Sequence, residues 1–215
     1  MGFLAFRKQP SLPLPAPNPP PETGSSENDL RELTRHLDED LGLITGALKA
    51  LQPGMSPEAL AGSLHRICFR PLGLASFFLA LADWERDMLA FPYYHEGGRE
   101  RKHTPRSLSK SPGLTGMTLQ RCESLYVRTL LEGKESGTIL SDAEADTGLV
   151  PQTWFGVPLG VDPAWGPRPF GVLSFQSFQP DAFSESRRAL MECLSGVLAF
   201  ALKADPALPL PGGKS

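Results

Sequence analysis

Cysteine is scarce in this sequence. The 215 residues include three cysteines, Cys68, Cys122 and Cys193, which lie far apart and form no CxxC pair. Such spacing argues against a disulfide framework and against a zinc knuckle. Because unpaired thiols suit a reducing compartment, we expect a cytoplasmic protein.

Long hydrophobic runs are also missing. No apolar stretch approaches the length that crosses a membrane. Near the N-terminus, Arg7 and Lys8 follow a very short apolar run, whereas a secretory signal places its charges first and continues with a longer apolar stretch. We therefore expect neither membrane insertion nor secretion.

The charges of the two signs are nearly balanced. A formal net charge of -3 and a pI of about 5.8 give no overall electrostatic reason to expect nucleic acid or an anionic membrane as a partner. One basic cluster departs from this balance: Arg99, Arg101, Lys102, Arg106 and Lys110, with His103. It is either a solvated loop, partly neutralised by neighbouring glutamates, or a mobile loop that meets an anionic ligand or partner. The spacing of His95, Glu96 and His103 matches no metal-ligand pattern, so we expect no metal site.

Proline and glycine are abundant, with 22 and 21 residues, and they gather at both ends of the chain. Gln9 to Ser26 is rich in proline and serine, and the residues after Asp205 are rich in proline and glycine. We predict disordered tails at 1–27 and 205–215, a helix at 28–52 and a globular domain at 53–204. A ligand for a proline-binding module is the functional alternative for the first tail.

The stretch from Asp29 to Leu51 has the pattern of an amphipathic helix. Leucine or isoleucine recurs every seven residues, with further leucines between, at positions 30, 33, 37, 41, 44, 48 and 51. Asn28 or Asp29 is the expected N-cap, and Gln52-Pro53-Gly54 the expected end. The stripe either packs on its own domain or pairs with the same helix of a second subunit. Its length of three heptads favours pairing.

Two further helices are predicted. Ser56 and Pro57 begin the first, which carries Leu60, Leu64, Ile67 and Cys68 on one face. Cys68 is therefore expected to be buried and inert, and His65 to lie at the boundary of that face. Ser184 caps the closing helix to Lys203, where Cys193 lies beside the apolar stripe and is expected to be structural.

Four apolar segments predict the main strands: 74–82, 88–94, 153–161 and 170–178. The first pair is joined by a polar hairpin turn. The second pair is joined by a loop with two prolines and a glycine and is expected to form neighbouring antiparallel strands at the centre of a sheet. Pro158 donates no hydrogen bond to a ladder, so it implies a bulge or an amide position facing an edge. The fold class is therefore mixed α+β.

Short motifs add a family resemblance. Phe155-Gly156-Val157-Pro158-Leu159, then Gly171-Val172-Leu173-Ser174-Phe175, then Phe183-Ser184 resemble the end of a GAF domain. Gly113-Leu114-Thr115-Gly116 and Glu123-Ser124-Leu125-Tyr126-Val127 resemble its middle. The resemblance covers about Pro57 to Lys203. It implies a profilin/PAS-like antiparallel sheet with flanking helices, in which the N- and C-terminal helices pack together.

The resemblance also implies a site and a function. A small ligand would enter between the sheet and the segments 113–121 and 142–150, with no cofactor specified. Candidate ligand-binding residues, chosen by strand parity and motif position, are Phe78, Ala80, Leu114, Thr118, Trp154, Gly156 and Ser174. The expected function is a bacterial-type sensory or regulatory module that signals through a homodimer, formed by the terminal helices, or through a partner protein. The alternative is a ligand-free dimerisation or interaction domain.

Several activities known in this family require residues that this sequence lacks. The cyclic-nucleotide signature of the family needs an asparagine, and the two asparagines, Asn18 and Asn28, precede the domain. Bilin attachment needs a cysteine followed by histidine, and no cysteine here has one. The remote enzymatic alternative is a free methionine-R-sulfoxide reductase, which requires a redox cysteine in the pocket wall. The matching wall, 141–153, has no cysteine. The same segment carries Asp142, Glu144 and Asp146, which could in principle hold a cation. The start of a helix is the simpler explanation for these acidic residues. We therefore expect a protein without enzymatic activity.

Overall fold

A computed structural model describes residues 23–110, 112–135, 150–162 and 166–204. The predicted tails before Thr23 and after Ala204, and the acidic segment 142–149, lie outside these residues. Backbone contacts divide the chain after Asp38. The described part of the first unit is the beginning of one helix, and the second unit contains the sheet.

Helices begin and end the described part of the chain and separate groups of antiparallel strands. The helices are α1 (Thr23–Ala50), α2 (Pro57–Cys68), α3 (Gly113–Arg121), α4 (Leu130–Glu135) and α6 (Glu185–Lys203). The strands are β1 (Ser76–Asp83), β2 (Met88–Glu96), β3 (Arg99–Glu100), β4 (Arg106–Ser107), β5 (Leu125–Val127), β6 (Thr153–Leu159) and β7 (Gly171–Ser177). They form one sheet in the order β3-β2-β1-β7-β6-β5, with β4 paired to β2. This confirms the α+β class predicted from the sequence.

The predicted central strands are neighbours. β6 and β7 pair antiparallel without a register shift, with Phe155 opposite Phe175 and Pro158 opposite Val172. On its other side β6 pairs with β5 only through residues 154–156. Pro158 therefore lies beyond the end of β5, where no ladder requires its missing N–H. Of the two expectations for this proline, the edge-facing position is the correct one.

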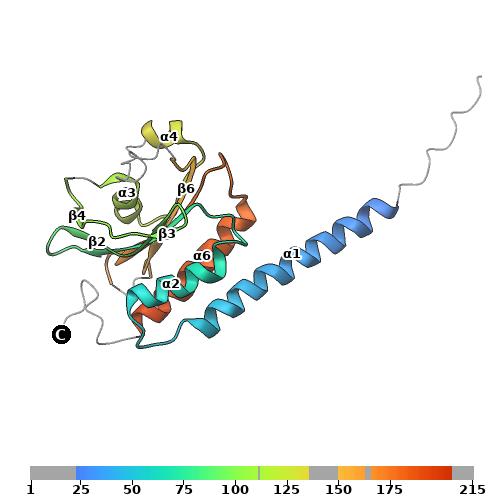
Figure 1. Cartoon of the computed structure of the whole chain (residues 1–215), viewed down its shortest axis with the longest axis horizontal. Coiled ribbons are helices and arrows are strands. Elements are labelled where there is room, and N and C mark those ends of the chain that lie inside the picture. The colour runs from blue at the N-terminus through green and yellow to red at the C-terminus, as the bar shows by residue number, and fades with distance from the viewer. Residues whose placement is uncertain (1–22, 111, 136–149, 163–165, 205–215) are drawn as a thin grey trace, which may run out of the picture. The chain divides into compact units, whose positions relative to one another are not determined.

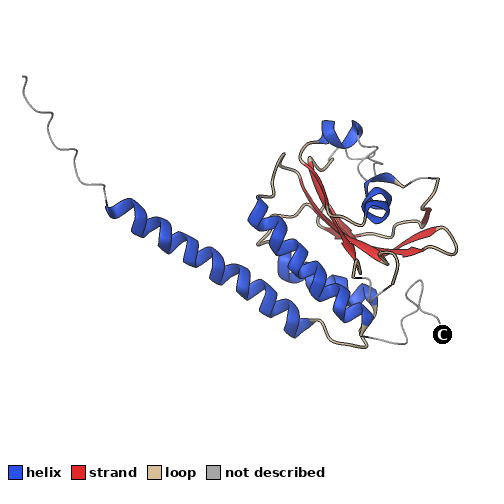
Figure 2. Ribbon diagram, turned by 180° about the vertical axis from the view of Figure 1, so that it is seen from behind, coloured by secondary structure: helices blue, strands red, loops and turns tan. Residues whose placement is uncertain are grey.

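Helices α2 and α6 cover one face of the sheet, and α3 lies over the opposite face (Figures 1 and 2). Both covering helices begin as the sequence predicts. The Ser56 hydroxyl accepts a 3.2 Å hydrogen bond from the Ala59 amide, and the Ser184 hydroxyl accepts one of 3.3 Å from the Arg187 amide. Each cap satisfies a first-turn amide that has no partner inside its helix. The larger core lies between these two helices and the sheet.

Helix α1 begins earlier than predicted. Asn28 and Asp29 lie inside it rather than capping it, because the last proline of the Pro-rich segment is Pro21 and nothing after it interrupts the helix. In the second unit, Ala47 and Leu51 are buried in the core with α2 and α6, and Asp40 lies 3.9 Å from Arg187 of α6. The end of the N-terminal helix segment therefore packs with the C-terminal helix, as expected.

Several predictions about single residues can be judged. Cys68 is fully buried, as predicted. The boundary position predicted for His65 is wrong, because strand β2 packs across α2 and leaves His65 only 6% exposed. Cys193 is exposed, since it lies on the outer side of α6. Among the described residues, no helix has the length and apolar character needed to cross a membrane.

Candidate functional site

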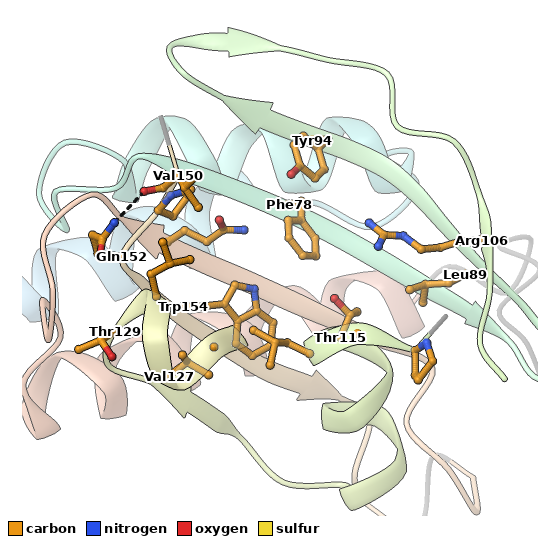
Figure 3. A pocket seen from close by; sticks show the side chains of 17 residues that line it. Phe78, Leu89, Tyr94, Arg106, Thr115, Val127, Thr129, Val150, Gln152 and Trp154 are labelled. Atoms are coloured by element: carbon orange, nitrogen blue, oxygen red, sulfur yellow. Dashed lines mark hydrogen bonds between the residues drawn. The ribbon is translucent and has the colours of Figure 1, made fainter. Parts of the chain in front are cut away.

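A pocket lies on the face of the sheet opposite α2 and α6 (Figure 3). The sheet supplies its floor through β1, β2, β6 and β7, and α3, β5 and α4 supply its walls. Its volume is about 60 Å³, which is room for about four to six water molecules. The lining residues are Phe78, Leu89, Tyr94, Arg106, Pro112, Gly113, Leu114, Thr115, Val127, Thr129, Leu130, Gly133, Val150, Pro151, Gln152, Trp154 and Gln176.

Aromatic rings form much of the floor. The Phe78 and Tyr94 rings stack with centroids 5.2 Å apart and an angle of 5° between their planes. The Trp154 indole lies over Gly156, where a Cβ atom would collide with the indole ring. Glycine at position 156 therefore lets the indole lie flat against its own strand. These rings give the pocket planar apolar surfaces on which a ligand ring or carbonyl group would stack.

Arg106 brings a positive charge to the pocket. Its guanidinium carbon lies 5.0 Å from the centroid of the Phe91 ring, and its Nη2 lies 3.0 Å from His103 Nε2. Since arginine only donates, His103 Nε2 accepts this hydrogen bond. His103 Nδ1 then carries the proton and donates to the Thr104 carbonyl at 3.0 Å. The His103 ring also contacts Phe91 and Tyr94, so several neighbours fix the position of the guanidinium.

The N-terminal end of α3 forms the adjacent wall. Pro112, Gly113, Leu114 and Thr115 all line the pocket. No side chain caps this end, and the backbone of Gly113 has a φ of +53° that favours glycine. The partial positive charge of a helix N-terminus is therefore directed toward the same space as Arg106.

Gln176 adds a neutral polar group from β7. Its side chain is 95% buried because β7 is an inner strand of the sheet. Nε2 donates one long bond of 3.4 Å to the Ser174 hydroxyl.

Solved structures with the same architecture identify the fold. The chain superposes on the GAF domain of the Acinetobacter phosphoenolpyruvate-protein phosphotransferase with a TM-score of 0.60, at 17% identity over 75% of this chain and 90% of that one. The chain has the GAF fold. Free methionine-R-sulfoxide reductase from Neisseria meningitidis, solved with its substrate, gives a TM-score of 0.60 at 17% identity over 75% and 87% of the two chains. The nlh2 GAF domain of A. aeolicus in an inactive state gives 0.57 at 14% over 77% and 96%.

No family model matches the sequence, and no curated protein matches it. At these identities the likeness establishes the fold alone. The GAF fold carries both regulatory domains and reductase enzymes among the similar structures. The function of this chain therefore has to be argued from its own residues.

The structure places three of the seven predicted ligand-binding residues in the lining of this pocket: Phe78, Leu114 and Trp154. The other four, Ala80, Thr118, Gly156 and Ser174, do not line it. Ala80, Thr118 and Ser174 are fully buried, and Gly156 lies beneath the Trp154 indole. Ala80, Gly156 and Ser174 lie on the sheet face that carries the cavity, but they are too small or too covered to reach it.

The polar residues Arg106 and Gln176 in the pocket lining were not among the residues predicted from the sequence. Gln176 has the same strand parity as Ser174, so parity offered a signal for it. Arg106 lies in the predicted basic cluster, but nothing in the sequence separates it from the other cations there. The structure does so, because the Arg106–Ser107 strand pairs with β2, while Arg99 and Lys102 are exposed.

A second polar cluster lies on the opposite, helix-covered face. The Tyr93 hydroxyl and His65 Nδ1 are 2.9 Å apart, and the His65 and His95 ring centroids lie 4.1 Å apart with an angle of 40° between the ring planes. Burial, followed by the proximity of His95 and Arg66, lowers the pKa of His65 to about 4. Burial also lowers the pKa of His95. His95 thus packs with α2, whereas His103 packs on the pocket side, so the two histidines do not share a site.

Proposed function

We propose that this chain is a GAF-like sensory or regulatory module that binds a small molecule in its pocket. The observation that carries the proposal is the combination of a real cavity with a few inward polar groups, above all the buried Gln176 amide and the fixed Arg106 guanidinium. Small-molecule sites in proteins are typically apolar cavities with a small number of such groups.

A conformational change in the pocket would be passed on to the C-terminal helix α6. Val127 of β5 lines the pocket, and the adjacent Tyr126 donates a 2.8 Å hydrogen bond to Asp181, shortly before α6. Arg188 of α6 lies 4.3 Å from the centroid of the Tyr126 ring. A ligand that displaces β5 would therefore also displace the start of α6, and the output is a change in how the terminal helices pack.

A change in helix packing becomes a signal only if another protein chain contacts these helices. A second copy of the same chain is suited to this role, because α1 carries an exposed apolar stripe. The leucines at positions 30, 33, 37, 41 and 48 are each more than half exposed. Their spacing of three or four residues, extended to seven at the end, keeps them on one side of the helix. Pairing of α1 with the α1 of another subunit would remove this surface from water. The signal would then pass through the dimer or through a further protein that recognises it.

The ligand-free dimerisation domain is less well supported. It predicts a pocket filled by large side chains, whereas the cavity here keeps inward polar groups. Sulfoxide reduction through cysteine is also less well supported. Cys68 lies in the core under α2, Cys122 and Cys193 are exposed, and none of the three lines the pocket. Thiol redox chemistry needs the sulfur at the substrate.

Native mass spectrometry tests the proposal directly. We expect the purified chain to show a dimer mass with additional small-molecule mass that disappears on denaturation. A dimer that takes up no mass, even from a metabolite extract, would contradict ligand binding and favour the dimerisation domain. A monomer at all concentrations tested would contradict pairing through α1.

A further inference from the structure

We propose that the pocket takes a small, uncharged, planar ring with an amide edge, meaning an N–H group next to a carbonyl group. This inference rests on the proposed function, since it names the ligand class of the same site. It follows from the contacts of the cation in the described lining, from two neutral polar side chains that lie opposite each other in the sheet, and from the aromatic floor.

The cation in the described part of the lining, Arg106, is engaged within the protein. Its guanidinium donates to His103 Nε2 at 3.0 Å, lies 5.0 Å from the centroid of the Phe91 ring, and makes a further contact within the chain. An anionic ligand group would have to compete with these contacts and would also lose its hydration in a mostly apolar cavity. A neutral ligand avoids both penalties.

Two neutral polar side chains lie side by side in the lining. Trp154 of β6 and Gln176 of β7 are directly opposite each other in the antiparallel register, and both line the pocket. Residues paired in this way have Cβ atoms about 4.5–5.5 Å apart on the same face of the sheet. Trp154 is 8% exposed and Gln176 is 5% exposed, so both are shielded from bulk water. A ligand that reaches one of them therefore also reaches the other.

The indole N–H of Trp154 is a hydrogen-bond donor at the cavity. Figure 3 shows the indole nitrogen on the side of the ring toward Phe78. Within the residues that the structure describes, this nitrogen makes no hydrogen bond, whereas a buried tryptophan N–H usually has a partner. Because an indole nitrogen only donates, the ligand group that meets it has to be an acceptor. A carbonyl oxygen satisfies this requirement without a charge.

The Gln176 amide offers a donor and an acceptor in one plane. Its Nε2 carries two hydrogens, and the bond that it makes to the Ser174 hydroxyl is long, at 3.4 Å. The other hydrogen can donate to a ligand carbonyl, while Oε1 can accept from a ligand N–H. Side-chain amides bind an adjacent donor and acceptor on a planar ring in this bidentate way, as in their pairing with adenine. An amide edge on the ligand would meet both atoms of Gln176, and the second lone pair of its carbonyl oxygen would accept from the Trp154 N–H.

The floor and the volume limit the rest of the ligand. The Phe78 and Tyr94 rings stack with nearly parallel planes, and the Trp154 indole adds a further flat surface. Aromatic surfaces of this kind favour a planar partner. The cavity of about 60 Å³ has room for about four to six water molecules, which suits one six-membered ring and not a nucleotide. Pyridones and pyrimidinones meet these conditions.

A small panel of probes separates the amide edge from the ring and from charge. 2-Pyridone has all the required features, N-methyl-2-pyridone lacks the N–H, δ-valerolactam lacks the aromatic ring, and benzoate replaces the amide edge by a charge. Calorimetry measures each affinity, and the Trp154 indole signal in a proton–nitrogen correlation spectrum locates the binding. The Trp84 indole, which donates to the Pro169 carbonyl at 2.8 Å outside the lining, is the internal reference. We expect 2-pyridone to bind at least about tenfold more tightly than each of the other probes.

Two variants test the named side chains. Gln176→Met keeps the length of the side chain and removes both hydrogen-bonding atoms, so 2-pyridone should lose its preference over N-methyl-2-pyridone. Trp154→Phe keeps an aromatic ring and removes the N–H, so both pyridones should bind more weakly and to a similar extent. Gln179→Met is the matched control, since Gln179 is exposed and lies outside the lining, and it should bind both as the unaltered chain does. Circular dichroism establishes that each variant is folded.

The outcomes distinguish this inference from the proposed function. If 2-pyridone binds no more tightly than N-methyl-2-pyridone, or if folded Gln176→Met keeps the preference, the amide-edge assignment is wrong. Tighter binding of benzoate, or a charged ligand found in the pocket after native mass spectrometry, would overturn the assignment while supporting the sensory module. Failure of every probe would also overturn it, and together with a clean dimer mass from a metabolite extract it would contradict the sensory module as well.

Discussion

The hydroxyl of Tyr126 donates a 2.8 Å hydrogen bond to the carboxylate of Asp181, which lies 55 residues further along the chain. The same hydroxyl accepts a 3.2 Å bond from the Phe183 amide, and Arg188 packs over the phenol ring. One side chain of an edge strand thereby fixes the turn that leads into α6. Burial, followed by the bond to Asp181, raises the pKa of Tyr126.

Tyr126→Phe should destabilise the fold by about 1–2 kcal/mol, because it removes one donor and one acceptor from this arrangement. Asp181→Asn keeps a residue type that tolerates the observed φ of +48° but removes the charge. Urea unfolding of the single and double variants should give effects that are not additive. Effects that add within about 0.3–0.5 kcal/mol would mean that the two side chains are not coupled.

The buried His65, which lies beside the partly buried His95, predicts an acid-sensitive fold. Because the pKa of His65 falls from 6.5 to about 4 in the folded chain, the unfolded chain binds more protons between these values. Stability should therefore be fully present above pH 6.5 and decrease as the pH falls toward 4, by up to about 3 kcal/mol. His95, Arg66 and the Tyr93 hydroxyl are the polar groups that face His65.

The double variant His65→Phe/Tyr93→Phe tests this dependence. It removes the titrating ring and also the hydroxyl that would otherwise lose its partner. Urea unfolding between pH 4 and 7 should show a shallower decline than in the unaltered chain. An identical decline in both proteins would mean that other groups cause the acid sensitivity.

Gly156→Ala should disturb the pocket floor. A Cβ atom at this position would collide with the Trp154 indole, so the ring must leave its strand. We expect a loss of about 1–3 kcal/mol in stability and a change in tryptophan fluorescence. Gly42→Ala is the matched control, since it meets nothing within 4 Å and lies in α1. It should stabilise the chain by up to about 1 kcal/mol, and a similar loss in both variants would contradict the explanation.

The three cysteines should differ in their reactivity toward a thiol reagent. Cys68 is fully buried, and burial raises its pKa to about 12, whereas Cys122 and Cys193 are exposed. Titration with Ellman's reagent should modify two thiols in the native protein and the third only after unfolding. Rapid modification of all three in native buffer would show that the core under α2 opens readily.

The leucine stripe gives a prediction about assembly. Leu33→Glu/Leu37→Glu places charges where both side chains are more than half exposed, so the fold should keep its stability. We expect light scattering to show that the unaltered chain is a dimer and this variant a monomer. Glu32→Ala, on another side of α1, should remain dimeric. A variant with the mass of the unaltered chain would exclude the stripe as the interface.

The sequence by itself determined the local features of this protein. The caps at Ser56 and Ser184 and the strands around Phe155 and Phe175 follow from residues only a few positions apart. Hydrogen bonds of a first helical turn and alternation along a strand are short-range effects, so the residues that produce them are readable directly. The motif order between Gly113 and Ser184 also indicated the GAF fold.

Only the tertiary structure decided which side chains meet. Phe78 lies opposite both Tyr94 and Ser174 because three strands from different parts of the chain pair with one another. That pairing brings Arg106 and Gln176 to one cavity, and it buries His65 against His95 on the other face. Each of these contacts joins residues far apart in the sequence. Their register depends on how the whole sheet packs against its helices, and no local pattern specifies it.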